Sequence, residues 1–364
     1  MKLKEITSYL ESIAPLELQE NYDNAGLIVG NQDMDIKGTL ITLDVTEDIV
    51  DEAINKDLNL IVAHHPIVFS GLKKFTGNSY VERIVIKAIK NDIAIYASHT
   101  NLDCIQGGVN TKIADKLNLK NQKILSTVSG QLLKLVYFVP QANAEETRNA
   151  IFDAGAGHIG NYDMCSYNVN GKGTFRAGEG TNPFVGNKGE IHIEEEIRVE
   201  TILPKYLKNK VIHALLESHP YEEVAFDIYP LENIFDKAGF GVCGDLEEEM
   251  SEINFLQYVK KAFSLECIRY TNLLNKSVRR VAVCGGSGSF LMKDAIRAKA
   301  DVFISGDFKY HQFFDADNKI LVADIGHFES EQFTKELFYE LLTKKFPKFA
   351  IHLTEINSNP INYL

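Results

Sequence analysis

The 364-residue sequence contains no tryptophan and no low-complexity tract, so globular folding throughout is expected. It also lacks any apolar run of about 18 residues, the length that a membrane-spanning helix requires. Its first residues open directly into an amphipathic pattern, without the apolar core of a signal peptide. From these absences we expect a soluble cytoplasmic protein.

Cysteine is scarce and irregularly spaced. The five cysteines are odd in number and never form a Cys-x-x-Cys pair, so the pattern favours neither a disulfide framework nor a zinc ribbon. Cys243 and Cys284 lie among apolar neighbours, where cysteine usually serves as a small core residue. The sequence therefore indicates a reducing compartment.

Positive charge is in deficit. The chain has 38 basic and 50 acidic residues, a net charge of -12, and its short basic groups are scattered. Nonspecific binding to a phosphate backbone depends on clustered lysine and arginine. The charge therefore argues against nucleic acid as the main partner, although nucleic-acid binding stays open as an alternative.

Two regions show an alternation of apolar strand-like segments with helical patterns, which is typical of an α/β fold with helix-covered sheets. In the first region, strands are predicted at 39–43, 58–63 and 93–97 and helices at 47–56, 80–91 and 108–118. In the second, strands are predicted at 280–284, 302–305 and 320–323 and helices at 290–299, 308–316 and from 327 onward. We therefore expect residues 1–127 and 236–364 to be the two βα halves of one discontinuous domain.

The middle of the chain, residues 128–235, has a different pattern. Strand-like segments at 133–139, 191–195 and 199–203 and helical patterns at 144–153 and 204–217 predict a small inserted α+β domain of ferredoxin-like type. Residues 170–189 are rich in glycine and are expected to form a long loop, of the kind that is either functional or mobile.

Potential metal ligands follow three of the predicted strands. His64 and His65 come directly after one strand, and Pro66 then breaks the extended pattern. Asp103 lies in the polar segment after the next strand, where a helix cap or an Asx turn is the simpler interpretation. His327 and Glu331 follow the last strand, four residues apart on one helical face, where a solvated pair is the alternative.

Because chemistry in such sheets gathers beyond the carboxyl ends of the strands, we expect these five side chains to meet. Three histidines and two carboxylates exceed what a catalytic zinc takes from protein, and they suit a two-metal site with a bridging carboxylate and water. Zinc, iron or manganese would accept this mixture of nitrogen and oxygen ligands. The sequence leaves open which carboxylate bridges.

The glycine-rich turn 285–289 follows a predicted strand and precedes a helix. Its backbone N–H groups could cradle a phosphate, but it lacks the Lys-Ser/Thr ending of a P-loop. A tight turn without a ligand is an equally good interpretation.

The chain as a whole resembles the dinuclear-metal family of GTP cyclohydrolase I type 2 homologues, also called the Nif-three-like family. The resemblance rests on five segments in order along the chain: Tyr22-Asp23-Asn24-Ala25-Gly26-Leu27-Ile28-Val29-Gly30, Ala63-His64-His65-Pro66, Ser98-His99-Thr100-Asn101-Leu102-Asp103, Ser305-Gly306-Asp307-Phe308-Lys309-Tyr310-His311 and the stretch from Asp324 to Glu331. The family's ligand pattern falls on the same five residues, His64, His65, Asp103, His327 and Glu331. The family usually has tryptophan where this chain has Tyr22, a change that leaves the metal site intact.

The resemblance has further implications. The segment from Ser218 to Asp227 is similar to the PII-like or CutA-like insert of the longer family members, and the family implies a toroidal homohexamer with the inserts as lids. It also implies a metal-dependent hydrolase with two divalent ions per subunit and a nucleotide-like or heterocyclic substrate. His99 and His311, in polar segments at strand ends, are the free imidazoles predicted to transfer protons.

A noncatalytic role is the rival hypothesis. In it the protein is a metal-binding regulatory or scaffold assembly, and the PII-like insert senses a small molecule.

Overall fold

The computed structural model describes all residues, 1–364, and the chain divides into two compact units. The larger unit consists of Met1–Thr127 together with Asp236–Leu364, and the smaller one is Val128–Phe235. None of the helices has the length and apolar character needed to cross a membrane.

The N-terminal part of the larger unit alternates strands and helices. Its elements are α1 (Leu3–Ile13), η1 (Leu16–Leu18), β1 (Gly26–Val29), β2 (Gly38–Thr42), α2 (Glu47–Asn55), β3 (Leu60–Ala63), α3 (Tyr80–Lys90), β4 (Ala94–Ala97), α4 (Thr100–Asp103), α5 (Val109–Lys116) and β5 (Lys120–Thr127). The predicted strands and helices of this region are all present within a few residues of their expected ends.

The C-terminal part continues the alternation. Its elements are β10 (Gly239–Ser251), α8 (Glu252–Ala262), β11 (Arg269–Tyr270), β12 (Ser277–Val283), η4 (Ser289–Leu291), α9 (Met292–Arg297), β13 (Val302–Ser305), η5 (Tyr310–Ala316), β14 (Leu321–Asp324), α10 (His327–Glu331), α11 (Thr334–Lys345) and β15 (Ala350–Leu353). Two predictions need correction: residues 310–316 form a 3-10 helix, and the helix expected from 327 is broken into α10 and α11.

These strands form two separate sheets, ordered β1-β4-β3-β2-β15 and β11-β14-β13-β12-β10-β5. In each sheet the central strands are parallel: β2, β3 and β4 in the first, and β12, β13 and β14 in the second. The halves also exchange strands, because β15 pairs with β2 and β5 pairs with β10. Both parts of the chain are therefore needed to complete either sheet.

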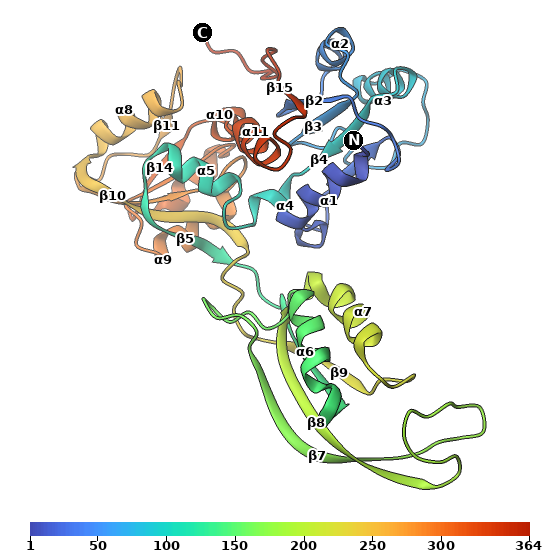
Figure 1. Ribbon diagram of the computed structural model, residues 1–364. Helices are drawn as coiled ribbons and strands as arrows, with labels where there is room; N and C mark the ends of the chain where they lie inside the picture. Colours follow the sequence, from blue (N-terminus) through green and yellow to red (C-terminus); the bar gives the residue numbers. More distant parts are fainter. The chain divides into compact units, whose positions relative to one another are not determined.

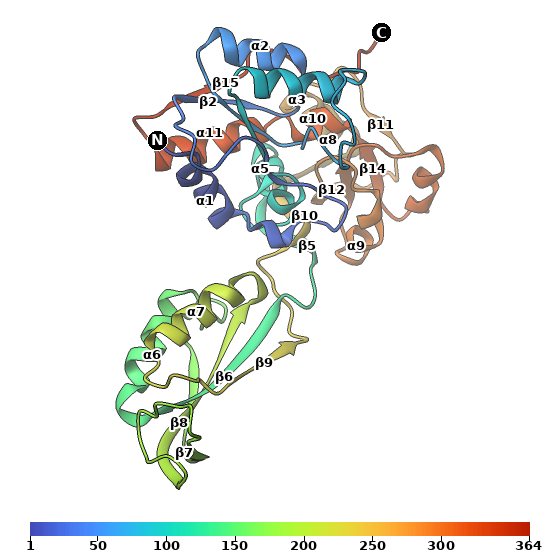
Figure 2. The ribbon, with the colours of Figure 1, turned by 90° about the vertical axis from the view of Figure 1, so that its right-hand side faces the viewer.

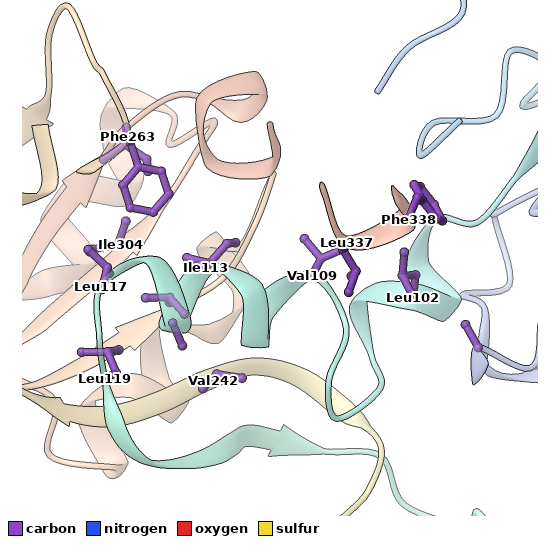
Figure 3. Packing of buried hydrophobic residues seen from close by; sticks show 14 of the residues in the cluster. Leu102, Val109, Ile113, Leu117, Leu119, Val242, Phe263, Ile304, Leu337 and Phe338 are labelled. Atoms are coloured by element: carbon purple, nitrogen blue, oxygen red, sulfur yellow. The ribbon is translucent and has the colours of Figure 1, made fainter. Parts of the chain in front are cut away.

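The main hydrophobic core lies between the two sheets. It contains apolar residues of both sheets and of α1, α5, α8 and α11, among them Val109, Ile113, Val242, Ile304 and Phe338 (Figure 3). A second cluster packs α2 and α3 on the outer face of the first sheet (Figure 1), and a third packs α9 and the 3-10 helix η5 on the outer face of the second. Each sheet is thus covered on both faces, which is why its central strands are almost continuously apolar.

The smaller unit has the order βαββαβ. Its elements are β6 (Leu132–Pro140), η2 (Gln141–Asn143), α6 (Ala144–Asp153), β7 (Ser166–Arg176), β8 (Ile191–Pro204), η3 (Lys205–Leu207), α7 (Lys208–Ser218) and β9 (Phe226–Leu231). The four strands form an antiparallel sheet in the order β7-β8-β6-β9, and α6 and α7 pack on one face of it (Figure 2). This is the ferredoxin-like arrangement.

Two predictions for this unit were wrong. Residues 170–176, expected to belong to a loop, continue strand β7, and the segments expected at 191–195 and 199–203 are one strand, β8. Together β7 and β8 form a long hairpin that extends past the helices (Figure 1).

Candidate metal centre

The five predicted ligands meet at one place in the larger unit, beyond the carboxyl ends of strands from both sheets. His64 and His65 follow β3, Asp103 ends the short helix α4 after β4, and His327 and Glu331 are the first and last residues of α10 after β14. Their ligand atoms fall into two groups, His65, His327 and Glu331 in one and His64, Asp103 and Glu331 in the other, with all atoms of a group within 4.8 Å of one another.

Glu331 lies between these two groups. Its Oε1 is 3.7 Å from His64 Nε2, and its Oε2 is 3.1 Å from both His65 Nε2 and His327 Nε2. His64 Nε2 is in turn 3.6 Å from Asp103 Oδ1. One buried carboxylate therefore connects the two sets of ligands.

Each imidazole is oriented by an acceptor at Nδ1, so that its Nε2 faces the centre. Nδ1 of His65 is 2.7 Å from Asp44 Oδ1, and Nδ1 of His327 is 2.7 Å from Asp307 Oδ2. Nδ1 of His64 is 2.9 Å from the carbonyl oxygen of Ser98. Metal-binding histidines commonly show this pattern, because the acceptor fixes the tautomer and makes the ligating nitrogen more basic.

A fourth imidazole belongs to the cluster. His99 Nδ1 is 2.8 Å from Asp23 Oδ1, and its ring lies 5.2 Å from that of His64 and 5.3 Å from that of His65. Thr100 donates from both its backbone N–H and its hydroxyl to the other oxygen of Asp23. Burial alone would raise the pKa of Asp23, but these hydrogen bonds lower it to about 2, so Asp23 is a carboxylate that orients His99.

His311, the other predicted proton carrier, is not brought to this place. It is exposed on η5 and packs against the rings of Tyr310 and Phe314, and it does not line the cavity that contains the cluster. Its position after a predicted strand was not enough to predict that it lies at the cluster, because η5 leads the chain away from the sheet edge.

The electrostatics of the cluster fit a bound cation. His64 Nε2 and Asp103 Oδ1 are buried without a hydrogen-bond partner, although such atoms are costly to bury unsatisfied. Burial lowers the pKa of His64 to about 4. Burial, together with the charge of Glu331, raises the pKa of Asp103 well above its usual range. A divalent ion would satisfy both atoms and stabilise the ionised carboxylate.

The other two imidazoles show the opposite shift. Burial by itself would lower their pKa values, but hydrogen bonds to Glu331 and to Asp44 or Asp307 raise the pKa of His65 to about 10 and that of His327 to about 9. Without a metal ion, the protonated imidazoles of His65 and His327 therefore bind the carboxylate of Glu331.

The glycine-rich turn 285–289 serves the same cluster. A side chain on Gly286 would place its Cβ 2.4 Å from Glu331 Oε1, and the residue has a φ of +58°. The backbone N–H groups of Gly285, Gly286 and Gly288 donate to side-chain oxygens of Asn110, Ser330 and Ser305 respectively. The turn is a tight turn that makes room for Glu331, and these three donors are not free to hold a phosphate.

Sequence reasoning missed the outer carboxylates Asp23, Asp44 and Asp307. Asp23 and Asp307 lie within two of the segments that carry the family resemblance, and Asp44 directly follows the predicted strand at 39–43; these positions were the available signal. Each pairs with an imidazole at the end of the neighbouring strand in the same sheet, so their partners depended on the strand order, which the local sequence does not give.

The cluster opens into a cavity of about 1440 Å³ lined entirely by residues of the larger unit. Its wall contains His65, His99, Asp103, His327 and Glu331, and its remaining surface includes aromatic and acidic side chains. A substrate of moderate size could therefore reach the cluster.

Comparison with known proteins gives matches along almost the whole chain. Two relatives named GTP cyclohydrolase 1 type 2 homolog, from Halalkalibacterium halodurans and Bacillus subtilis, are 41% and 38% identical, each over 99% of this chain and 98% of the relative. A crystal structure of a Bacillus cereus protein related to NIF3 is 40% identical and covers 100% of this chain and 99% of that chain, with a TM-score of 0.86. The sequence profile of the family Duf34/NIF3 (NGG1p interacting factor 3) matches residues 1–360. The chain therefore belongs to the Duf34/NIF3 family.

Proposed function

We propose that this protein is a dinuclear metal-dependent hydrolase that acts on a nucleotide-like or heterocyclic substrate, with zinc, iron or manganese as the metal. The observation that carries the proposal is the convergence of three pre-oriented imidazoles with the carboxylates of Asp103 and Glu331 beside one cavity. When bound there, a pair of divalent ions supplies Lewis-acid chemistry and makes water a better nucleophile at neutral pH.

The two groups of ligands suggest how the ions would be held. His64 and Asp103 would hold one ion, and His65 and His327 the other. Glu331 would bridge them, since one of its oxygens faces His64 and the other faces His65 and His327. We thus propose Glu331 as the bridging carboxylate, a role that the sequence leaves open between Asp103 and Glu331.

His99 is proposed to move the proton. Its Nδ1 is held by Asp23, and its ring lines the cavity next to His64 and His65. An imidazole that is anchored at one nitrogen can take or give a proton at the other without moving. His99 would thus protonate the leaving group or accept a proton from the attacking water.

The test combines metal content with hydrolysis. Wild type and the variants His64→Ala, Glu331→Gln and His352→Ala would be purified without added metal, analysed for bound metal and assayed on a panel of cyclic amides, nucleosides and nucleotides. We expect loss of metal and of hydrolysis in the first two variants, while His352, exposed on β15, serves as the matched control. Full metal content in both site variants would refute the proposed ligands, and hydrolysis that persists without metal would refute the mechanism.

We further propose a homohexamer, which rests on the family resemblance alone. Native mass spectrometry of the full chain measures the assembly directly, and a monomer or dimer at micromolar concentration would contradict the proposal.

The noncatalytic alternative has one observation in its favour. The smaller unit contains its own cavity of about 600 Å³, lined by Phe175, Phe184 and Tyr221. The hydroxyl of Tyr221 donates to Glu196, which also lines this cavity. A PII-like sensor function predicts that small aromatic metabolites raise the melting temperature of wild type but not of Tyr221→Ala.

A further inference from the structure

The charge of the cavity at the metal centre restricts what can enter it. Among its lining residues are eight acidic side chains, and its only lysine or arginine is Lys87. That lysine is not free, because its Nζ lies 2.5 Å from Asp51 Oδ2. A nucleoside triphosphate carries about four negative charges, and proteins usually bind such groups with free arginine or lysine side chains.

Two bound divalent ions would not reverse this charge. Five carboxylates ligate or orient the cluster, and their five negative charges outweigh the four positive charges of two such ions. Of the other acidic residues that line the cavity, Glu47 and Asp51 are paired with Arg83 and Lys87, which leaves the charges of Glu20 and Asp48. The cavity therefore keeps a negative potential with the metal present, which opposes the entry of polyanions.

The glycine N–H groups beside the cluster are not available to a phosphate either. In the glycine-rich turn beside Glu331, three N–H groups are already bonded to the side chains of Asn110, Ser330 and Ser305. The pair Lys73-Lys74, the nearest basic residues along the chain to Phe69, does not line the cavity.

Aromatic side chains supply the cavity with flat apolar surface instead. Tyr22, Phe69, Tyr80 and Phe290 all line it and are more than half exposed. The ring of Phe69 packs edge-on against His99, with the ring centres 5.7 Å apart. Such exposed rings can stack on a planar group next to the metal cluster.

We infer that the substrate of this site is a planar ring compound without a phosphate chain, either uncharged or cationic, and not a nucleoside triphosphate. The inference rests on the proposed hydrolase function and narrows its substrate class. A nucleoside, a nucleobase or a cyclic amide fits the acidic, aromatic-lined cavity, whereas the triphosphate implied by the relatives' name does not.

The first test compares turnover within matched pairs. Metal-loaded wild-type protein in its native assembly would be assayed on guanosine and GTP, adenosine and ATP, and a set of neutral cyclic amides. We expect hydrolysis of at least one phosphate-free compound to exceed that of every triphosphate by about 10-fold or more, the scale of electrostatic steering in charged clefts. A triphosphate that is hydrolysed faster than its own nucleoside overturns the inference.

The second test measures binding and does not depend on turnover. GTP would be titrated into metal-loaded wild type, Asp48→Lys and Asp315→Lys at low salt. Asp48 is exposed at the start of α2 and lines the cavity, whereas Asp315 is exposed on η5 outside it. We expect weak binding to wild type and about 10-fold tighter binding only to Asp48→Lys.

The outcomes separate the inference from the proposed function. Tight GTP binding to wild type that Asp48→Lys leaves unchanged overturns the inference, whether or not the protein is a hydrolase. If no compound is hydrolysed but GTP binds weakly and Asp48→Lys tightens it, the hydrolase proposal fails and the exclusion of polyphosphates stands.

Discussion

Asp44 gives the sharpest test of the dinuclear arrangement. It touches only one of the two ligand groups: its Oδ1 is 2.7 Å from His65 Nδ1, and its other oxygen accepts a hydrogen bond from Ser358. The variant Asp44→Asn keeps the shape of the side chain and an acceptor oxygen but removes the charge that makes His65 a strong ligand. His64 is oriented by the carbonyl of Ser98 and is not touched by the change.

The expected magnitude follows from the role of such outer partners. Loss of a carboxylate behind a metal-binding histidine typically weakens metal affinity by about 10- to 100-fold. That corresponds to about 1.4–2.8 kcal/mol. We therefore expect one of the two metal-binding steps of Asp44→Asn to weaken by this amount and the other to stay unchanged.

The assay is a zinc titration of metal-free protein in competition with a chromophoric chelator. Asp315→Asn removes the same charge from an exposed position outside the cavity and serves as the control. Equal weakening of both steps, or no weakening of either, would refute the assignment of His65 and His64 to different ions.

Three further predictions concern protons, backbone and core. In metal-free protein the pKa values of His65 and His327 are raised to about 10 and about 9, so both imidazoles are protonated at pH 7.5. Since ligation needs neutral imidazoles, metal binding should release about two protons and should tighten as the pH rises toward 9. Calorimetry in buffers of different ionisation enthalpy measures the number of protons released. Gly286→Ala should destabilise the fold by about 1 kcal/mol or more, because residue 286 has a positive φ, and chemical denaturation measures this loss. The added Cβ should also displace Glu331 and weaken metal binding, which the zinc titration measures. An unchanged metal affinity would contradict this second effect. Phe338→Ala empties a fully buried position between the two sheets and should cost about 3–5 kcal/mol in the free energy of unfolding, measured by urea denaturation, with a loss below about 1 kcal/mol as the contrary result.

The strand ends were the most predictable part of this protein. Short, mostly apolar runs such as 302–305 appear in the structure as the strand β13 with the same ends, because a strand covered on both faces needs apolar residues at nearly every position. Polar residues just after such runs had to lie at a sheet edge, and this was enough to nominate His64, His65, Asp103, His327 and Glu331 as neighbours. The structure brings all five together.

What the sequence could not supply were long-range pairings. Nothing in the local pattern of β15 or β5 tells which sheet each joins, and both join the sheet formed by the other half of the chain. The glycines at 171 and 173 suggested a loop, because glycine has low strand propensity. In the structure Gly173 lies in β7 beneath the carboxylate of Glu196, where a Cβ would lie 2.1 Å from Glu196 Oε2. The position of His311 likewise depends on the direction in which η5 leaves the sheet edge, and the periodicity of the sequence does not predict that direction.

The strands β5 and β10 bear on how the protein is divided. The smaller unit is inserted between them, yet they pair directly, with Thr127 opposite Gly239 and Ser126 opposite Phe240. The chain therefore leaves and re-enters the larger unit at adjacent positions of one ladder, as it would across a simple hairpin turn. A short turn in place of the insert would keep every hydrogen bond of that ladder. An insertion or deletion of the whole unit during evolution would therefore leave both sheets of the larger unit, and the metal ligands at their edges, intact. The two units can thus change under separate selective pressures, one set by chemistry at the sheet edges and the other by whatever the insert contacts.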